Sequence, residues 1–172
     1  GFVFTPNALA VAPLATEAKK PMVIMNAATS IITTKSPYVV RVSFTLPQVS
    51  APLATWAMKN GIKSVYTLVS DYAPGADAEG QFKKTFEAAG GKLVDSVRVP
   101  VQNPDFAPYI QRIKDAKPEA VFVFLPAGAQ GTAFLKAFQE RGLAKLGIKV
   151  IATGDVTEDQ ELGAMGDAAL GV

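Results

Sequence analysis

The chain contains no cysteine and no histidine among its 172 residues. It therefore has no thiolate nucleophile, no zinc site of the usual Cys and His ligands, and no serine–histidine or cysteine–histidine catalytic pair. Histidine is also the usual general base near neutral pH. We therefore expect no enzyme, no metal site and no cofactor. The lack of cysteine suits a reducing cytosol and a bacterial periplasm equally, so it does not identify the compartment.

The sequence also lacks an excess of one charge and a long apolar run. Its net charge is +2, with both signs interspersed, so no basic stripe is present that could hold a nucleic-acid backbone. No run approaches the roughly 18 apolar residues that cross a bilayer, and no secretory signal pattern stands within the chain. We expect neither a nucleic-acid partner nor direct membrane insertion.

What is present is typical of a folded protein, with 49% apolar and 19% charged residues. The chain opens in an apolar run, GFVF, and stops at LGV, which resembles the start of another. Both features predict an internal piece of a larger sequence.

From Lys63 onward the sequence alternates short apolar runs with amphipathic stretches, about every 28 residues. This alternation predicts an α/β fold with a parallel sheet whose strands are buried on both faces. The expected strands are Ser64–Val69, Lys92–Val97, Ala120–Leu125 and Lys149–Thr153. The expected helices are Ala78–Ala89, Phe106–Ala116 and Gln130–Arg141.

The first part of the chain follows the same logic in shorter elements. The expected elements are a strand at GFVF, a helix over Asn7–Ala18, and strands over Met22–Met25 and Val39–Phe44. The pattern shifts between Phe44 and Gln48, and a helix over Leu53–Asn60 opens the long βα series. We therefore place a domain crossing there, with domains over residues 1–44 and 45–172.

Several stretches, in this order, carry a family resemblance: PLATEAKKP, the Ala27-Ala28-Thr29 turn, YVVRVSFT, the Asp71-Tyr72 turn and DFAPYIQRIKDAKPEAVF. Together they resemble the leucine/isoleucine/valine-binding family of periplasmic proteins, which are type I solute-binding proteins. The resemblance implies two α/β lobes of parallel sheets flanked by helices. Residues 1–44 would be part of the N-terminal lobe, and residues 45–172 most of the C-terminal lobe.

The resemblance also implies a function. A small amino-acid-like, aromatic or keto carboxylic acid would bind in a cleft between the lobes, and hinge closure would deliver it to the permease of an ABC transporter. The protein would then be periplasmic, secreted by a signal peptide that this chain does not contain. The same two-lobed module also serves in receptors and regulatory proteins, so a ligand sensor is the alternative.

Open α/β sheets bind ligands beyond the carboxyl ends of their strands, which nominates strand-end loops as the site. In the first domain these are Thr5, Pro6 and Asn7, whose polar groups could cap a helix or touch a carboxylate. The second loop is Ala27, Ala28 and Thr29. In the family this turn contacts the ligand carboxylate through its backbone and the Thr hydroxyl.

In the second domain the expected ligand contacts are Tyr72, Pro74, Ala127 and Asp155. Relatives that bind amino acids carry an aromatic residue where this chain has Pro74, which predicts a cleft remodelled for a flatter or bulkier ligand. Asp155 aligns with an acidic residue that pairs with the ligand ammonium in those relatives. Tyr72 could instead be a packing ring, and Asp155 could cap the next helix.

Two further functions find less support. A hydrolytic enzyme could use Asp71 and Asp155 as an acid–base pair, but no spacing demands it. No GxGxxG follows a strand and no GxxxxGK occurs, so nucleotide binding is not predicted.

Overall fold

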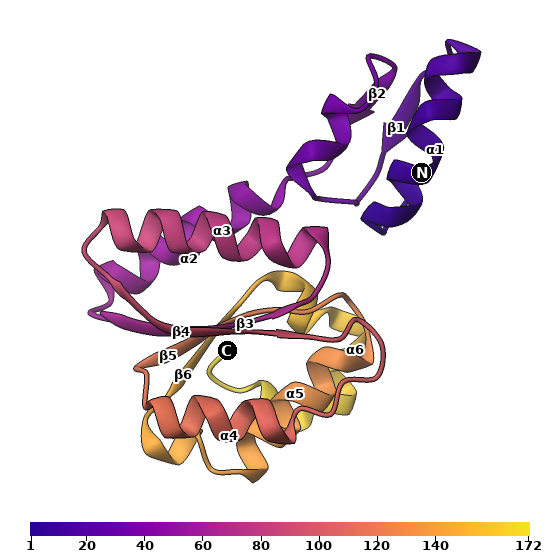
Figure 1. Ribbon diagram of the computed structural model, residues 1–172. Coiled ribbons are helices and arrows are strands. Elements are labelled where there is room, and N and C mark those ends of the chain that lie inside the picture. Colours follow the sequence, from indigo (N-terminus) through magenta and orange to yellow (C-terminus); the bar gives the residue numbers. More distant parts are fainter. The chain divides into compact units, whose positions relative to one another are not determined.

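The computed structural model describes all 172 residues, which form two compact units, Gly1–Val49 and Ser50–Val172. Figure 1 labels their helices and strands. The first unit contains the helix α1 (Thr5–Ala18), the strand β1 (Met22–Ile24), a short 3-10 helix (Ser30–Thr34), the strand β2 (Val39–Arg41) and the start of α2 (Leu46–Lys59).

The core of the first unit lies on one face of two parallel strands, β1 and β2. Buried alanines of α1 pack there against buried Met22, Ile24 and Val39 of the strands, together with Ile32 of the 3-10 helix. The small alanine side chains allow the helix to approach the sheet closely. On the other face Val23 and Val40, which are partners in the strand register, are 43% and 50% exposed.

The expected strand at GFVF is wrong. Phe2 adopts a left-handed backbone with φ of +70°, and the chain enters α1 at Thr5. The carbonyls of Gly1 and Phe2 still accept hydrogen bonds from the N–H groups of Met25 and Ala27, both at 3.2 Å. The segment therefore runs beside the turn after β1 without forming an extended strand, because the left-handed residue bends it away.

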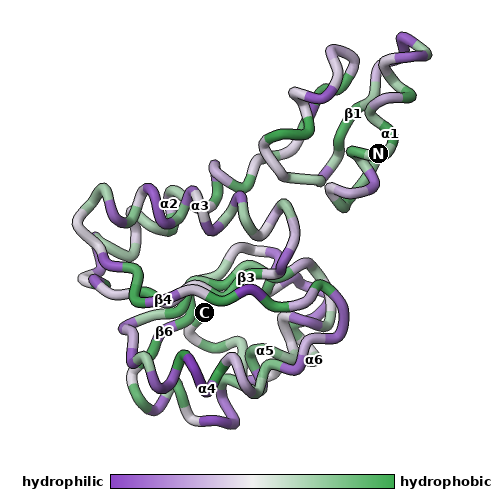
Figure 2. The backbone as a smooth tube through the Cα atoms, viewed as in Figure 1, coloured by the Kyte–Doolittle hydropathy of each residue, from purple (hydrophilic) through white to green (hydrophobic).

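The second unit is built on a four-stranded parallel sheet in the order β4-β3-β5-β6. Its strands are β3 (Ser64–Ser70), β4 (Lys92–Val99), β5 (Ala120–Phe124) and β6 (Lys149–Ala152). Its helices are α3 (Ala73–Ala88), α4 (Ala107–Ala116), α5 (Ala129–Glu140) and α6 (Asp159–Met165), preceded by most of α2. The two central strands, β3 and β5, are buried along almost their whole length, and Figure 2 shows hydrophobic residues along β3.

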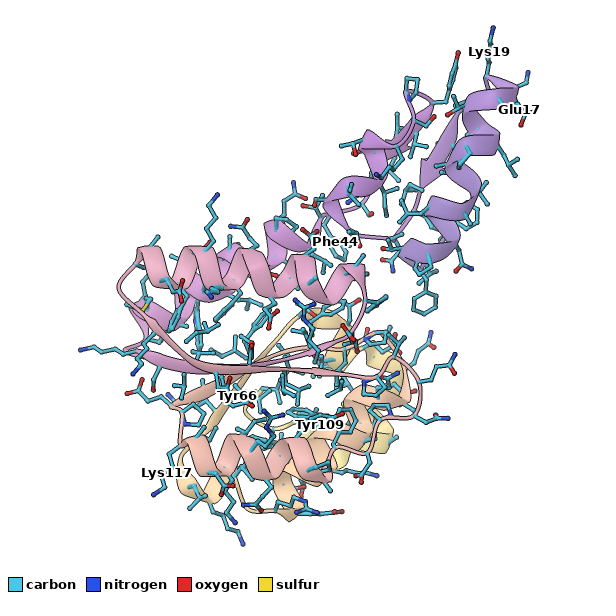
Figure 3. The ribbon with its side chains drawn as sticks, in the orientation of Figure 1. Glu17, Lys19, Phe44, Tyr66, Tyr109 and Lys117 are labelled. Carbon is cyan, nitrogen blue, oxygen red and sulfur yellow. The ribbon has the colours of Figure 1, made fainter.

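Helices cover both faces of this sheet, as Figure 1 shows. On the face of α2 and α3, the ring of Phe82 stacks on Phe122 of β5 at 4.1 Å between centroids. On the other face, buried Tyr66 of β3, labelled in Figure 3, belongs to one hydrophobic cluster with Ile110 and Ile113 of α4. Strands buried on both faces explain the continuous apolar runs in the sequence.

The expected strands of the second unit are confirmed to within two residues at their ends. The helices α4 and α5 begin and end within one residue of expectation. However, α2 begins at Leu46, because Thr45 and Gln48 form a capping box: the N–H of Thr45 donates to Oε1 of Gln48 at 2.7 Å, and the N–H of Gln48 donates to the Thr45 hydroxyl at 3.4 Å.

Two other helices differ from expectation. The helix α3 begins at Ala73, since Pro74 occupies its first turn, where a missing N–H costs nothing. The helix α6 was not predicted, because its seven residues are too few to show an apolar period. No helix of the chain is both long enough and apolar enough to cross a bilayer.

Candidate functional site

Each unit gathers expected site residues at the carboxyl edge of its own sheet. In the first unit Thr29 follows β1, and Thr5 lies in the first turn of α1. Their hydroxyl groups share a hydrogen bond at 2.7 Å, and both side chains are buried. The structure thus brings together two expected residues that lie 24 positions apart in the chain.

The backbone around Thr29 is held from two sides. The guanidinium of Arg41, at the end of β2, donates a hydrogen bond from Nη2 to the Thr29 carbonyl at 2.6 Å. The N–H of Leu46 donates to the Ala28 carbonyl at 2.9 Å. A loop held in this way keeps its shape without a ligand, so any ligand contact there is preorganised.

The remaining expected residues of the first unit differ in their surroundings. The side chain of Ala27 is buried in the core, and its N–H donates to the Phe2 carbonyl. Pro6 and Asn7 are exposed in the first turn of α1, where helical N–H groups lack intrahelical partners. Ala28 is half-buried.

In the second unit Tyr72 follows β3 after one residue, Asp71, and precedes the first residue of α3. Its ring stacks on Phe124, the last residue of β5, with 6.2 Å between centroids and 28° between planes. This spacing falls within the range that aromatic pairs prefer. Because β3 and β5 are neighbours in the sheet, this stacked pair lies at its carboxyl edge, where Phe124 is buried and Tyr72 is half-buried.

Asp155 lies beyond the next strand, β6, and interacts electrostatically with Tyr72. Burial raises the pKa of the Asp155 carboxyl above its ordinary value, while a hydrogen bond donated by the Thr153 hydroxyl acts in the opposite direction. That bond joins Thr153 Oγ1 to Asp155 Oδ2 at 3.2 Å. Burial, and secondarily the Asp155 charge, raises the pKa of Tyr72, so its hydroxyl keeps its proton at physiological pH.

Two glycines near this edge are required by the backbone for different reasons. A Cβ on Gly75 would lie 1.9 Å from the carbonyl oxygen of Ser70, so only glycine fits where α3 leaves the sheet. Pro74 is buried beside it. After β5, Ala127 is half-buried, and Gly128 adopts φ of +115°, which other residues rarely adopt.

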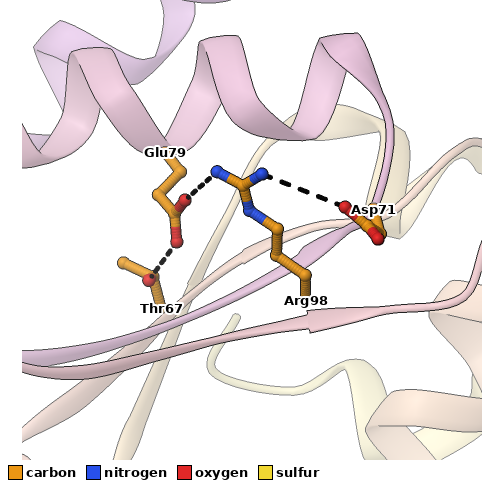
Figure 4. A network of polar contacts seen from close by, with 4 residues as sticks. All are labelled: Thr67, Asp71, Glu79 and Arg98. Carbon is orange, nitrogen blue, oxygen red and sulfur yellow. Dashed lines mark hydrogen bonds and ion pairs between the residues drawn. The ribbon is translucent and has the colours of Figure 1, made fainter.

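A polar network ties α3 to the sheet behind Tyr72 (Figure 4). Glu79 Oε1 accepts a hydrogen bond from the buried Thr67 hydroxyl at 2.8 Å, and its Oε2 pairs with Nη2 of Arg98 at 3.0 Å. Nη1 of Arg98 lies 3.9 Å from Oδ1 of Asp71. The N–H of Asp71 donates to the Val99 carbonyl at 2.8 Å, which fixes the turn that presents Tyr72.

Sequence reasoning missed three contributors to these edges: Phe124, Arg41 and Thr153 as a hydrogen-bond donor. Phe124 could have been found as the last residue of a buried strand, since that position faces the carboxyl edge. Arg41 could have been found as the one charge within the apolar run YVVRVSF. No group of three or more acidic side chains is placed to hold a metal ion.

The two edges differ in chemistry. In the first unit hydroxyl groups, helical N–H groups and a guanidinium are hydrogen-bond donors, which suit an anionic group. In the second unit the half-buried ring of Tyr72, backed by buried Phe124, stands beside a carboxylate acceptor, which suits a ring that carries a hydrogen-bond donor. The chain has neither cysteine nor histidine, so neither edge carries a thiol or an imidazole.

Comparison with known proteins finds a family that fits this picture. The family described as periplasmic binding protein matches residues 1–172, the whole chain. A relative from Brucella melitensis biotype 1, named Leu/Ile/Val-binding protein homolog 6, is 51% identical over 172 residues. The match covers 100% of this chain and 44% of the relative, so the chain spans less than half of that protein's length.

Solved structures are also similar. A solute-binding protein of an ABC transporter from Rhodopseudomonas palustris BisB5, in complex with 3,4-dihydroxybenzoic acid, is 63% identical with a TM-score of 0.95. The match covers 100% of this chain and 47% of that one. Its counterpart from R. palustris HaA2, in complex with p-hydroxybenzoic acid, is 53% identical with a TM-score of 0.97 over the same shares. A leucine-binding protein from Thermotoga maritima, 24% identical with a TM-score of 0.85, shows the same fold.

Proposed function

Because this chain belongs to the periplasmic binding protein family, we propose that the complete protein is the receptor subunit of an ABC importer for a small aromatic carboxylic acid. In this proposal residues 1–44 belong to the N-terminal lobe and residues 45–172 to the C-terminal lobe. The compact units divide a few residues later, between Val49 and Ser50, within helix α2.

The ligand class rests mainly on one observation, the stacked pair of Tyr72 and Phe124 beside Asp155. A flat ring buries more area against the half-buried ring of Tyr72 than a branched aliphatic chain does, and ring stacking adds to that gain. The hydroxybenzoic acids bound by two similar R. palustris proteins support the same class. A strict aliphatic amino-acid ligand is therefore not what we propose.

We assign the carboxylate of the ligand to the first unit. Thr5 and Thr29 offer hydroxyl donors, the first turn of α1 offers backbone N–H groups, and Arg41 adds a positive charge. Pro6, Asn7, Ala27 and Ala28 would also contact the ligand, mainly through their backbone. In the second unit the ligand contacts that we propose are Tyr72, Pro74, Ala127 and Asp155.

Transport follows from capture. We propose that the two lobes close on the ligand by hinge bending and that the permease of the ABC transporter recognises and binds the closed form. This role places the protein in the periplasm. It requires no catalytic group, so the ligand should be released chemically unchanged.

A thermal-shift and calorimetric screen of the complete protein tests the proposal. We expect 4-hydroxybenzoate or 3,4-dihydroxybenzoate to raise the melting temperature, because a ligand that binds only the folded state stabilises it by mass action. Leucine, phenylpyruvate and tryptophan serve as aliphatic, keto-acid and amino-acid comparisons. Mass spectrometry of the released ligand should return the unaltered compound. Stabilisation by leucine alone, or by none of the aromatic acids, would contradict the aromatic-acid assignment.

A further inference from the structure

The amino edge of the second unit, where the parallel strands of its sheet begin, carries exposed lysines. Lys63 stands just before β3, and Lys92 and Lys149 are the first residues of β4 and β6. Backbone hydrogen bonds join these strand starts: the N–H of Lys92 donates to the Lys63 carbonyl at 2.8 Å, and the N–H of Lys149 donates to the Glu119 carbonyl at 3.0 Å. All three lysines are exposed.

The helices that lead into these strands end at the same edge and add further positive charge. Lys59 is the last residue of α2, and Lys117 and Arg141 cap the ends of α4 and α5. All three are exposed, and Figure 3 labels Lys117 at this end of α4. Charges that are interspersed along the sequence thus gather in space, because each βα unit returns the chain to one edge. We call the surface that these residues form the basic edge: Lys59, Lys63, Lys92, Lys117, Arg141 and Lys149.

Acidic residues at this edge are fewer than the cations. They are Glu87, Asp115, Glu119 and Glu140. The carboxylate of Glu119 accepts hydrogen bonds from the N–H groups of Lys63 and Ser64, so it serves the backbone at the start of β3. The ion pairs that Arg98 forms toward the far end of β4 include none of these cations. The basic edge therefore keeps a surplus of positive charge.

Helix stability explains only part of this arrangement. A cation at the C-terminal end of a helix complements the helix dipole, which accounts for Lys59 and Lys117. Sheets have only small net dipoles, so the lysines that begin β4 and β6 gain no comparable stabilisation. Like charges gathered on one surface also repel each other and oppose folding. The surplus is therefore better explained by an anionic partner.

An apolar recess of about 510 Å³ opens within the basic edge, between the end of α4 and the 3-10 helix Ala144–Leu146. Leu146 is 58% exposed, and it follows exposed Lys145. The residues that line the recess are Lys114, Asp115, Lys117, Pro118, Leu146 and Ile148. Apolar walls beside lysines suit a partner that carries both anionic and aliphatic groups.

We propose that the basic edge attaches the protein to an anionic phospholipid surface, where Leu146 and the recess contact aliphatic parts of the lipid. A lysine can lay its aliphatic stem on apolar groups while its ammonium stays among the headgroups. A nucleic-acid backbone offers no aliphatic chain and is often held by the planar fork of arginine, whereas all but one of the basic-edge cations are lysines. Attachment of this kind is peripheral and needs no spanning helix. It goes beyond the proposed ligand-binding function and uses the opposite edge of the sheet.

Cosedimentation of the complete protein with phospholipid vesicles at low ionic strength tests the proposal. We expect vesicles that contain phosphatidylglycerol to bind it at least about tenfold more tightly than pure phosphatidylcholine vesicles, and added salt to weaken the binding. Each lysine near an anionic surface contributes roughly fivefold, so the triple variant Lys117→Glu, Lys145→Glu, Lys149→Glu should lose at least about 100-fold in affinity. All three positions are exposed, so the fold should tolerate the change.

The matched control is the triple variant Lys19→Glu, Lys20→Glu, Lys35→Glu in the first unit. It changes the net charge equally, its positions are exposed, and Lys19 caps α1 in the left-handed conformation that Lys117 adopts after α4. It should lose less than about tenfold, because its charges lie outside the basic edge. Leu146→Ser leaves the charge unchanged and should weaken vesicle binding by about threefold to tenfold through lost apolar contact.

Thermal unfolding and 4-hydroxybenzoate binding are measured for every variant. Both should be retained in the basic-edge variant, which separates a lipid-binding role from a structural one. Equal binding to the two kinds of vesicle, or equal losses in the two triple variants, would overturn the proposal. Binding to polyglutamate but not to phosphatidylglycerol vesicles would also overturn it and would assign the edge to an acidic protein. In each of these cases, 4-hydroxybenzoate binding by the wild type would leave the proposed function intact.

Discussion

The hydroxyl groups of Thr5 and Thr29 share a buried hydrogen bond 2.7 Å long. Because both side chains are buried, removing one hydroxyl leaves the other without that partner. Thr5→Val and Thr29→Val should each lower the free energy of unfolding by about 1–3 kcal/mol, whereas the double variant should cost less than the sum of the two. Chemical denaturation of all three proteins measures the coupling. Thr33→Val, at an exposed position nearby, is the control and should change little. Strictly additive losses would mean that the two hydroxyls do not stabilise each other.

Gly75 and Gly80 lie in the same helix, α3, and alanine substitutions at the two positions should have opposite effects on stability. A methyl group at Gly75 would collide with the Ser70 carbonyl, so Gly75→Ala should destabilise the second unit by about 1–3 kcal/mol. Nothing lies within 4 Å of the corresponding position at Gly80, so Gly80→Ala should stabilise the helix by about 1 kcal/mol. Thermal unfolding of both variants shows the sign of each change. A neutral Gly75→Ala would indicate that the end of β3 can shift to make room.

Glu79 should contribute more to stability than its partner Arg98. Glu79→Ala would leave the buried Thr67 hydroxyl without its acceptor, at a cost of about 1–3 kcal/mol. Arg98 is 48% exposed, and exposed ion pairs contribute about 0–1 kcal/mol, so Arg98→Ala should cost little. Urea denaturation compares the two variants. Glu87→Ala, at an exposed position of the same helix, is the control. A larger loss for Arg98→Ala than for Glu79→Ala would contradict this order.

Glu119 lies near the amino ends of β3 and β5 and makes the stability of the protein depend on pH. The N–H groups of Lys63 and Ser64 donate to Oε2 of Glu119 and lower the pKa of its carboxyl. The unfolded chain then binds more protons than the folded one as the carboxyl titrates, so its contribution is present above its unfolded pKa and is lost as pH falls through the folded pKa. Glu119→Gln should therefore lower stability at pH 7 and cost less at pH 3. Denaturation at both pH values measures the difference. An equal loss at the two pH values would show that the charge is not what matters.

Much of the second unit could be predicted from sequence, because strands buried on both faces leave continuous apolar runs such as SVYTLV and AVFVF. The first unit was harder, since a four-residue apolar run such as GFVF does not reveal the left-handed Phe2 that bends it. The expectation that strand-end loops gather at the carboxyl edge of the sheet holds for Tyr72 and Asp155. The stacking of Phe124, the donor role of Thr153 and the pairing of Thr5 with Thr29 depend on which segments meet in space. Local patterns in the sequence do not contain that information.

The strand order β4-β3-β5-β6 has a consequence for how the second unit folds. The central strand β3 meets β4 after one helix, but it gains its other neighbour only when β5 arrives, and Ser64 and Glu119 lie 55 residues apart. On a ribosome that adds roughly 5–20 residues per second, the open edge of β3 waits several seconds for this partner. During that interval the strand edge can pair with other chains, so newly made protein should benefit most from chaperones at this stage of synthesis.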